Sequence, residues 1–143
     1  MRIVFDMDNT LVDELGATLR PGIVELLERL KAEKHTLILW TSSVKWRATT
    51  ILKDHGLARF FSETRFRENY DPDNTGKPKD IREVKGDILI DDDPKLIAYL
   101  KTIGKPGFLI SAFRQGMTPD PEELQRLYQA IARTGSWWRK ILP

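Results

Sequence analysis

Two aspartates lie directly after a short apolar run near the start of the chain. Ile3, Val4 and Phe5 precede Asp6 and Asp8, which are one residue apart. Two carboxylates this close repel each other and lose hydration at the end of a buried strand, so a cation between them is favoured. Oxygen ligands of this kind suit Mg²⁺. One such carboxylate can attack a phosphorus atom while the metal takes up negative charge, and its neighbour can transfer a proton.

Three further polar clusters follow apolar runs or lie in loops. Taken singly, each has a simpler explanation, such as a turn, a helix cap or a solvated lysine. In an open parallel sheet, however, ligands bind at the carboxyl ends of the strands, so clusters at these ends can converge on one site with the first two aspartates. The clusters are Thr41, the pair Lys77 and Lys79, and the trio Asp91, Asp92 and Asp93.

The elements that must position these residues alternate along the chain. Short apolar runs predict strands at residues 3–5, 36–40, 87–91 and 107–110, with a short edge strand within 58–70. Helical periodicity predicts helices that begin at Pro21, near Val44, at Pro94 and at Asp120. This alternation is typical of βαβ units, and it predicts one α/β domain over residues 1–143 with helices on both faces of a mainly parallel sheet of about five strands.

Composition excludes several classes of protein and site. The 143 residues are 41% hydrophobic and 31% charged, which is typical of a globular protein. Because the chain has no cysteine, it has no disulfide, thiolate zinc site or cysteine nucleophile. His35 and His55 both fall at the ends of predicted helices, so a histidine zinc site is not expected.

Net charge and hydropathy limit the classes of partner and the cellular compartment that we expect. A net charge of +2 slightly favours anionic substrates but is far from the dense basic surface of a dedicated nucleic-acid binder. No apolar stretch resembles a transmembrane span, so no membrane partner is expected. The apolar run after Met1 is too short for a signal peptide, and we expect a cytoplasmic protein.

The polar clusters, in this order, resemble the haloacid dehalogenase (HAD) superfamily of aspartyl phosphatases over roughly residues 1–100. The chain is most similar to its NIF-like branch, which includes the phosphatases of the carboxy-terminal domain of RNA polymerase II. Two departures are Asn9, where that branch usually has Glu, and a gap between Asp8 and Arg20 that is shorter than in eukaryotic members. The motifs that carry the resemblance are Asp6-Met7-Asp8-Asn9-Thr10-Leu11, Leu19-Arg20-Pro21-Gly22, Trp40-Thr41-Ser42-Ser43, Arg65-Phe66-Arg67-Glu68, Lys79-Asp80-Ile81 and Ile90-Asp91-Asp92.

This resemblance implies a Rossmann-like, doubly wound phosphatase domain and a role for each catalytic residue. Asp6 would be the nucleophile that forms an aspartyl-phosphate, and Asp8 would protonate the leaving oxygen and then deprotonate the attacking water. Thr41 would hydrogen-bond a phosphoryl oxygen. Lys79 would neutralise charge on the transferring phosphoryl group. We prefer it to Lys77, which we interpret as a solvated loop lysine.

The resemblance also implies residues that bind the metal and the substrate. Asp6, Asp8, Asp91 and Asp92 would form the Mg²⁺ site, with Asp8 contributing its backbone carbonyl and Asp91 also orienting the lysine or a metal-bound water. Ser42 and Arg67 would lie near the substrate phosphate, although a surface ion pair explains Arg67 equally well.

The expected function is Mg²⁺-dependent hydrolysis of a phosphomonoester. In the superfamily, a cap domain that encloses small substrates is inserted after the first motif or between the second and third, and neither gap here is long enough to hold one. An open cleft favours a macromolecular substrate, with a phosphoprotein preferred over nucleic-acid ends on charge grounds. The alternatives are a phosphatase of nucleic-acid ends, a phosphatase of a small metabolite and a non-catalytic binding module.

One feature near the C-terminus leaves two interpretations open. Trp137 and Trp138 stand beside Arg139 and Lys140, a combination that can stack on bases and bind phosphate. We prefer a tail that packs on the sheet or in a dimer, and the sequence does not indicate the oligomeric state.

Overall fold

The predicted strands form a five-stranded, all-parallel sheet in the computed structural model, which describes the backbone of residues 1–141 and the side chains of residues 1–136. The sheet order is β3-β2-β1-β4-β5. The α/β, Rossmann-like, doubly wound architecture is therefore confirmed, and the expected edge strand is β3. The strands are β1 (Arg2–Phe5), β2 (Thr36–Trp40), β3 (Phe61–Arg65), β4 (Ile88–Asp91) and β5 (Gly107–Leu109).

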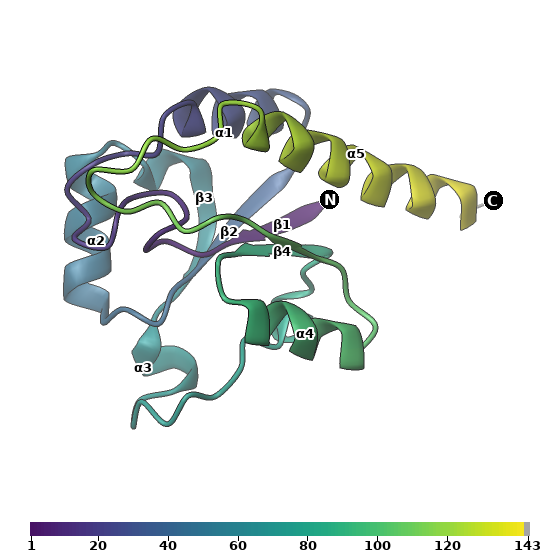
Figure 1. Ribbon diagram of the computed structural model, residues 1–143. Helices are drawn as coiled ribbons and strands as arrows, with labels where there is room; N and C mark the ends of the chain where they lie inside the picture. Colours follow the sequence, from purple (N-terminus) through teal and green to yellow (C-terminus); the bar gives the residue numbers. More distant parts are fainter. Residues whose placement is uncertain (142–143) are drawn as a thin grey trace.

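Helices cover both faces of the sheet (Figure 1). On one face, α1 (Ile23–Ala32), α2 (Lys45–Asp54) and α5 (Glu123–Ile141) pack on side chains such as Ile3 and Phe5 of β1. On the other face, α3 (Arg67–Tyr70), the 3₁₀ helix η2 (Ile81–Val84) and α4 (Pro94–Thr102) pack on Val4. A second 3₁₀ helix, η1 (Ala58–Phe60), leads into β3. Successive residues of a strand face opposite sides, so the continuous apolar run of β1 serves both layers.

Two helices begin later than their sequence signals predict. Helix α1 begins at Ile23, so the prediction of Pro21 as its first residue is wrong: Gly22 adopts a left-handed conformation with φ 82° and interrupts the helical backbone. Helix α5 begins at Glu123 instead of Asp120, whose side chain accepts a hydrogen bond from the Glu122 N–H in a preceding turn. Helix α4 begins at Pro94 as predicted, and Asp93 caps it by accepting a hydrogen bond from the Lys95 N–H.

The described part of the chain has no inserted cap domain. Only turns separate β1 from α1, and only β3 and short helical segments lie between α2 and β4. Within the same residues, no helix combines the length and the apolar character required to cross a bilayer.

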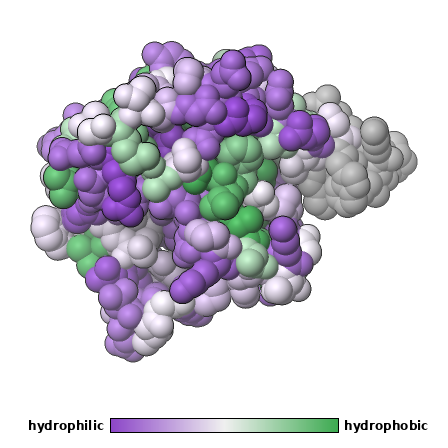
Figure 2. All heavy atoms as spheres, in the orientation of Figure 1, coloured by the Kyte–Doolittle hydropathy of each residue, from purple (hydrophilic) through white to green (hydrophobic). Residues whose placement is uncertain are grey.

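Figure 2 shows a largely hydrophilic face, with hydrophobic surface gathered between α5 and α4. The expectations for the Trp137 and Trp138 side chains lie outside the described side chains.

A buried arginine ties the loop after β1 to the start of α5. Arg20 is only 2% exposed, and its guanidinium donates to the carbonyls of Thr10 and Asn9 at 2.6 and 2.9 Å. It also donates to the Ser111 carbonyl and forms an ion pair with Glu123 at 3.3 Å. Glu123 accepts a further bond from the Ser111 N–H. The Arg20 guanidinium and the Glu123 carboxylate are both buried, so each depends on these partners for its hydrogen bonds.

We predict that Arg20→Ala lowers the free energy of unfolding by about 3–5 kcal/mol, because it leaves the Glu123 carboxylate buried without its cation. Urea unfolding followed by circular dichroism measures the change. Glu28→Gln, which removes the exposed ion pair with Arg59, is the control and should cost less than about 1 kcal/mol. A similar loss in the two variants would contradict the structural role of Arg20.

Candidate active site

An acidic cleft of about 440 Å³ lies at the carboxyl ends of the central strands. Strands β1 and β4 are adjacent there, although they are far apart in the sequence. From β1 the chain continues to strands on one side of this point, and from β4 it continues to the strand on the other side. Such a switch point is where open α/β sheets bind ligands. The sequence-predicted residues that line the cleft are Asp6, Asp8, Ser42, Lys79, Asp91 and Asp92, together with Lys77.

Lys79 joins the first and last aspartate motifs. Its ammonium group lies 2.8 Å from Oδ1 of Asp6, at the end of β1, and 2.9 Å from Oδ2 of Asp91, at the end of β4. All three side chains are buried. A lysine in this position is fixed by two charge-assisted hydrogen bonds, which hold it beside the Asp6 carboxylate. Lys77, two residues earlier, is exposed.

Burial and mutual repulsion shift the pKa values of these groups. Burial raises the pKa of Asp6 well above its ordinary value, and the Lys79 ammonium only partly offsets this rise. The pKa of Asp92 is also raised, first by burial and then by the nearby Asp91. Burial alone would lower the pKa of Lys79, but the carboxylates of Asp6 and Asp91 outweigh it, so the pKa is raised and the lysine stays charged.

The donor atoms fit a hard divalent cation. Carboxylate oxygens of Asp6, Asp91 and Asp92 all lie within 4.8 Å of one another. A cation among them would relieve the repulsion that raises the pKa values of Asp6 and Asp92. The side chain of Asp8 is not in this group, because both of its oxygens bind the guanidinium of Arg47.

The loop after β1 has a backbone that explains the unusual residue at position 9. Asn9 has φ 63°, in the left-handed region that asparagine adopts more readily than glutamate does. The tight turn lets Thr10 donate its hydroxyl to Oδ2 of Asp6 at 3.2 Å. The departure from the usual motif therefore coincides with a local conformation that favours the residue present.

The other residues predicted to contact the phosphate lie in the loop after β2 or bind to it. Thr41 is buried, and its Oγ1 accepts a hydrogen bond from the Ser43 N–H at 3.0 Å. Ser42 lines the cleft. Nε of Arg67 donates to the Ser42 carbonyl at 2.8 Å, so this arginine supports the loop from beside the cleft.

Asp71, which sequence reasoning did not select, anchors the loop that carries Lys79. One of its carboxylate oxygens accepts from the N–H and hydroxyl of Thr75, and the other accepts from the N–H groups of Gly76 and Lys77. These bonds, led by that of the Thr75 N–H, lower the pKa of Asp71. The Asp-Pro-Asp-Asn-Thr-Gly composition of residues 71–76 was a signal for such a turn.

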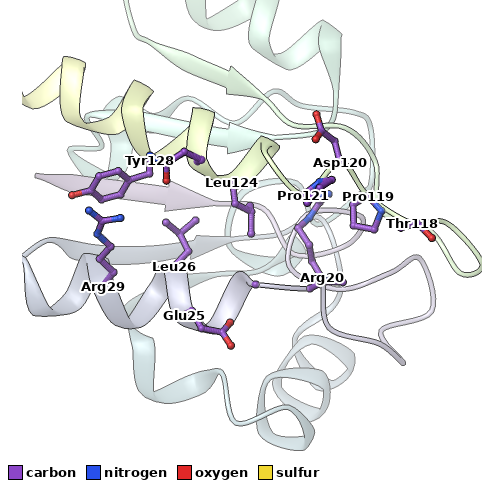
Figure 3. A pocket seen from close by; sticks show the side chains of 13 residues that line it. Arg20, Glu25, Leu26, Arg29, Thr118, Pro119, Asp120, Pro121, Leu124 and Tyr128 are labelled. Atoms are coloured by element: carbon purple, nitrogen blue, oxygen red, sulfur yellow. The ribbon is translucent and has the colours of Figure 1, made fainter.

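A second hollow, of about 600 Å³, lies between α1, α5 and residues 118–121 (Figure 3). There the guanidinium of Arg29 lies over the ring of Tyr128 at 3.6 Å, and Leu26 and Leu124 contribute apolar surface. The three-carboxylate group is in the acidic cleft instead, so the chemistry points to that cleft.

Comparisons with known proteins match most of the chain to one family. Residues 1–135 match the family of NLI interacting factor-like phosphatases, so the match extends beyond the roughly 100 residues in which the sequence motifs lie. No curated protein matches the chain.

Solved structures show the same fold at low identity. An uncharacterized protein from Listeria monocytogenes is 13% identical with a TM-score of 0.70, over 95% of this chain and 99% of its own. A D,D-heptose 1,7-bisphosphate phosphatase from B. bronchiseptica, complexed with magnesium and phosphate, is 14% identical with a TM-score of 0.66, over 92% of this chain and 98% of its own. A hydrolase from Streptococcus pneumoniae is 14% identical with a TM-score of 0.65, over 90% and 97% of the two chains.

We predict that Asp71 stabilises the protein above about pH 4 and that this contribution is lost at lower pH. The folded-state pKa is lowered, so the contribution is complete above the unfolded value of about 3.9 and disappears as the pH falls through the folded value. Urea unfolding of the wild type and Asp71→Asn between pH 2.5 and 6 measures the difference, which should shrink with acidification. A difference that grows on acidification would contradict the role of Asp71.

Proposed function

The chain belongs to the family of NLI interacting factor-like phosphatases, within the haloacid dehalogenase superfamily, and we propose that it hydrolyses phosphomonoesters with Mg²⁺ through an aspartyl-phosphate on Asp6. The observation that carries this proposal is the convergence of Asp6, Lys79 and the Asp91-Asp92 pair at one strand switch point. That arrangement supports Asp6 as the nucleophile, because its carboxylate lies beside a fixed cation and near further carboxylate oxygens that could bind a metal.

The acidic group supports the choice of metal. Asp6, Asp91 and Asp92 offer carboxylate oxygens alone, the donors that Mg²⁺ prefers. The backbone carbonyl of Asp8 is the further ligand implied by the family motif. Bound Mg²⁺ would neutralise charge on the phosphoryl oxygens. The similarly folded heptose bisphosphate phosphatase was solved with magnesium and phosphate, which supports the same pairing here.

Each of these residues has a separate role in the proposed reaction. The Asp6 carboxylate attacks phosphorus, and Asp8 gives a proton to the leaving oxygen and later takes one from the attacking water. Lys79 keeps its positive charge in the buried site and stabilises the negative charge of the transition state. Ser42 at the cleft wall supplies a hydrogen bond to the phosphoryl group, and Arg67 supports that loop. Thr41 is the further hydrogen-bond donor implied by the family motif, although its buried side chain does not line the cleft.

The shape of the site supports a macromolecular substrate, with a phosphoprotein as our choice. No inserted domain covers the cleft in the described part of the chain, so a small metabolite would bury little surface on binding. A phosphorylated protein brings its own surface to exclude water from the site. The net charge of +2 gives little support for a polynucleotide.

The central test measures both the metal and the covalent intermediate. Hydrolysis of an aryl phosphate should require Mg²⁺ and stop when EDTA removes it. Brief incubation with ³²P-labelled substrate should yield an acid-stable, base-labile phosphoenzyme in the wild type and none in Asp6→Asn, because an amide is not a comparable nucleophile. Undiminished activity in excess chelator, or labelling of Asp6→Asn, would contradict the proposal.

The two lysines of the same loop provide a matched comparison. Lys79→Ala should lower kcat by about 100-fold, as does the removal of a group that stabilises transition-state charge. Lys77→Ala should change it much less, because Lys77 is exposed and Lys79 is buried against Asp6. Thermal unfolding of both variants separates lost activity from lost fold, and the reverse ranking in folded proteins would assign the role to Lys77.

The substrate class is tested by a panel at saturating Mg²⁺. We expect higher kcat/KM for phosphoproteins than for phosphorylated DNA ends, and low values for free sugar phosphates, because only large substrates cover the open cleft. A free metabolite hydrolysed with kcat/KM of about 10⁵ M⁻¹s⁻¹ or more, within the usual range of dedicated enzymes, would overturn the macromolecular assignment.

A further inference from the structure

Asp8 is held by an arginine that no sequence motif singled out. Nη1 of Arg47 donates to Oδ2 of Asp8 and Nη2 donates to Oδ1, both at 2.9 Å. Paired bonds of this kind fix the plane of a carboxylate as well as its position. The Asp8 carboxylate lines the acidic cleft, so its orientation bears on the reacting phosphate.

Arg47 is itself anchored on two sides. Nη1 also donates to the Ser43 hydroxyl at 3.0 Å, and Nη2 donates to the Glu14 carbonyl at 3.4 Å. The turn that contains Glu14 is attached to α2 at its other end, where Nε2 of His55 donates to the Gly16 carbonyl at 2.8 Å. The guanidinium therefore connects the loop after β1, the loop after β2 and the first turns of α2.

These contacts distinguish the pair from an ordinary surface ion pair. An exposed pair between two long side chains is worth little, because both lose freedom when they meet. Here both partners are about 70% withdrawn from solvent, with exposed fractions of 30% for Arg47 and 27% for Asp8. Without the guanidinium, the Asp8 carboxylate would lose both of the hydrogen bonds that fix its plane.

We propose that Arg47 is a positioning residue that holds the Asp8 carboxylate in a fixed orientation for the second half of the reaction, an inference that rests on the proposed function. In that step a water oxygen bonds to phosphorus, the bond between phosphorus and Asp6 breaks, and one water proton passes to Asp8. Inorganic phosphate and the free Asp6 carboxylate are the products. Asp8 must be aimed at the water before this step, and the bidentate pair with Arg47 fixes its orientation.

The test uses an aryl phosphate whose phenolate leaves without a proton, so that Asp8 acts only in the second step. Rapid-quench kinetics with Mg²⁺ should show a phenolate burst of unchanged rate in Arg47→Ala, followed by steady turnover about 10-fold slower than the wild type. The phosphoenzyme should accumulate. Asp8→Asn should show the same pattern with steady turnover about 100-fold slower, and the double variant should be no slower than Asp8→Asn alone.

The comparison includes variants that separate positioning from fold. Arg47→Gln retains much of the side chain and should behave as Arg47→Ala does, so the inference stays testable if the alanine variant does not fold. Arg59→Ala removes an exposed arginine that pairs with Glu28 and should leave both phases unchanged. Thermal unfolding is measured for each protein.

Three outcomes would overturn the assignment of Arg47: equal slowing of the burst and steady phases, a further loss on adding Arg47→Ala to Asp8→Asn, or faster steady turnover. A merely structural role would produce the first two. The proposed function fails separately if the wild type forms no phosphoenzyme on Asp6, or if Asp8→Asn leaves the steady phase unchanged.

Discussion

The site depends on one buried cation between two carboxylates. Lys79 lies 2.8 Å from Asp6 and 2.9 Å from Asp91, and these three groups come from the ends of two adjacent strands and from the loop between η2 and α3. Without the ammonium group, Asp6, Asp91 and Asp92 would repel one another in a place where water screens them poorly. The lysine therefore holds together the charged groups that, in our proposal, bind a metal ion and a phosphate.

The surrounding loops are stabilised by polar groups that satisfy backbone hydrogen bonds. Asp71 binds four donors in residues 75–77 and so shapes the approach of the chain to Lys79. Arg20 binds the carbonyls of Asn9 and Thr10 from inside the protein and links them to α5 through Glu123. Loops that carry charged groups at an open cleft have few apolar contacts, so these hydrogen bonds replace the packing that fixes helices and strands.

The two aspartates of the first motif have different partners in the cleft, which suits the different roles that we propose for them. Asp6 is buried and faces Lys79, which suits the nucleophilic role that we propose for it. Asp8 is more exposed and lies against Arg47, which suits the proton transfers with leaving group and water that we propose for it. Because the cleft has no cap domain in the described part of the chain, water exclusion falls to the substrate in our proposal.

The sequence by itself determined the layers of the fold and most of the candidate residues. The apolar run at residues 36–40 is strand β2, and Asp93 caps α4, because strand burial and helix capping depend on neighbours in the chain. The predicted starts of α1 and α5 were too early. Pro21 and Asp120 are residue types that favour a helix start, but here they belong to turns that precede the helices. The departure at Asn9 was visible, but its left-handed backbone was not.

Only the tertiary structure decided which charged groups meet. Lys77 and Lys79 are equivalent by composition, and burial between Asp6 and Asp91 distinguishes them. The pairs of Arg20 with Glu123 and Arg47 with Asp8 join residues far apart in the chain, and no local pattern around one partner identifies the other. Local patterns report the conformation of neighbouring residues, whereas the energy of an ion pair depends on distance and burial, which arise when strands from distant segments form one sheet.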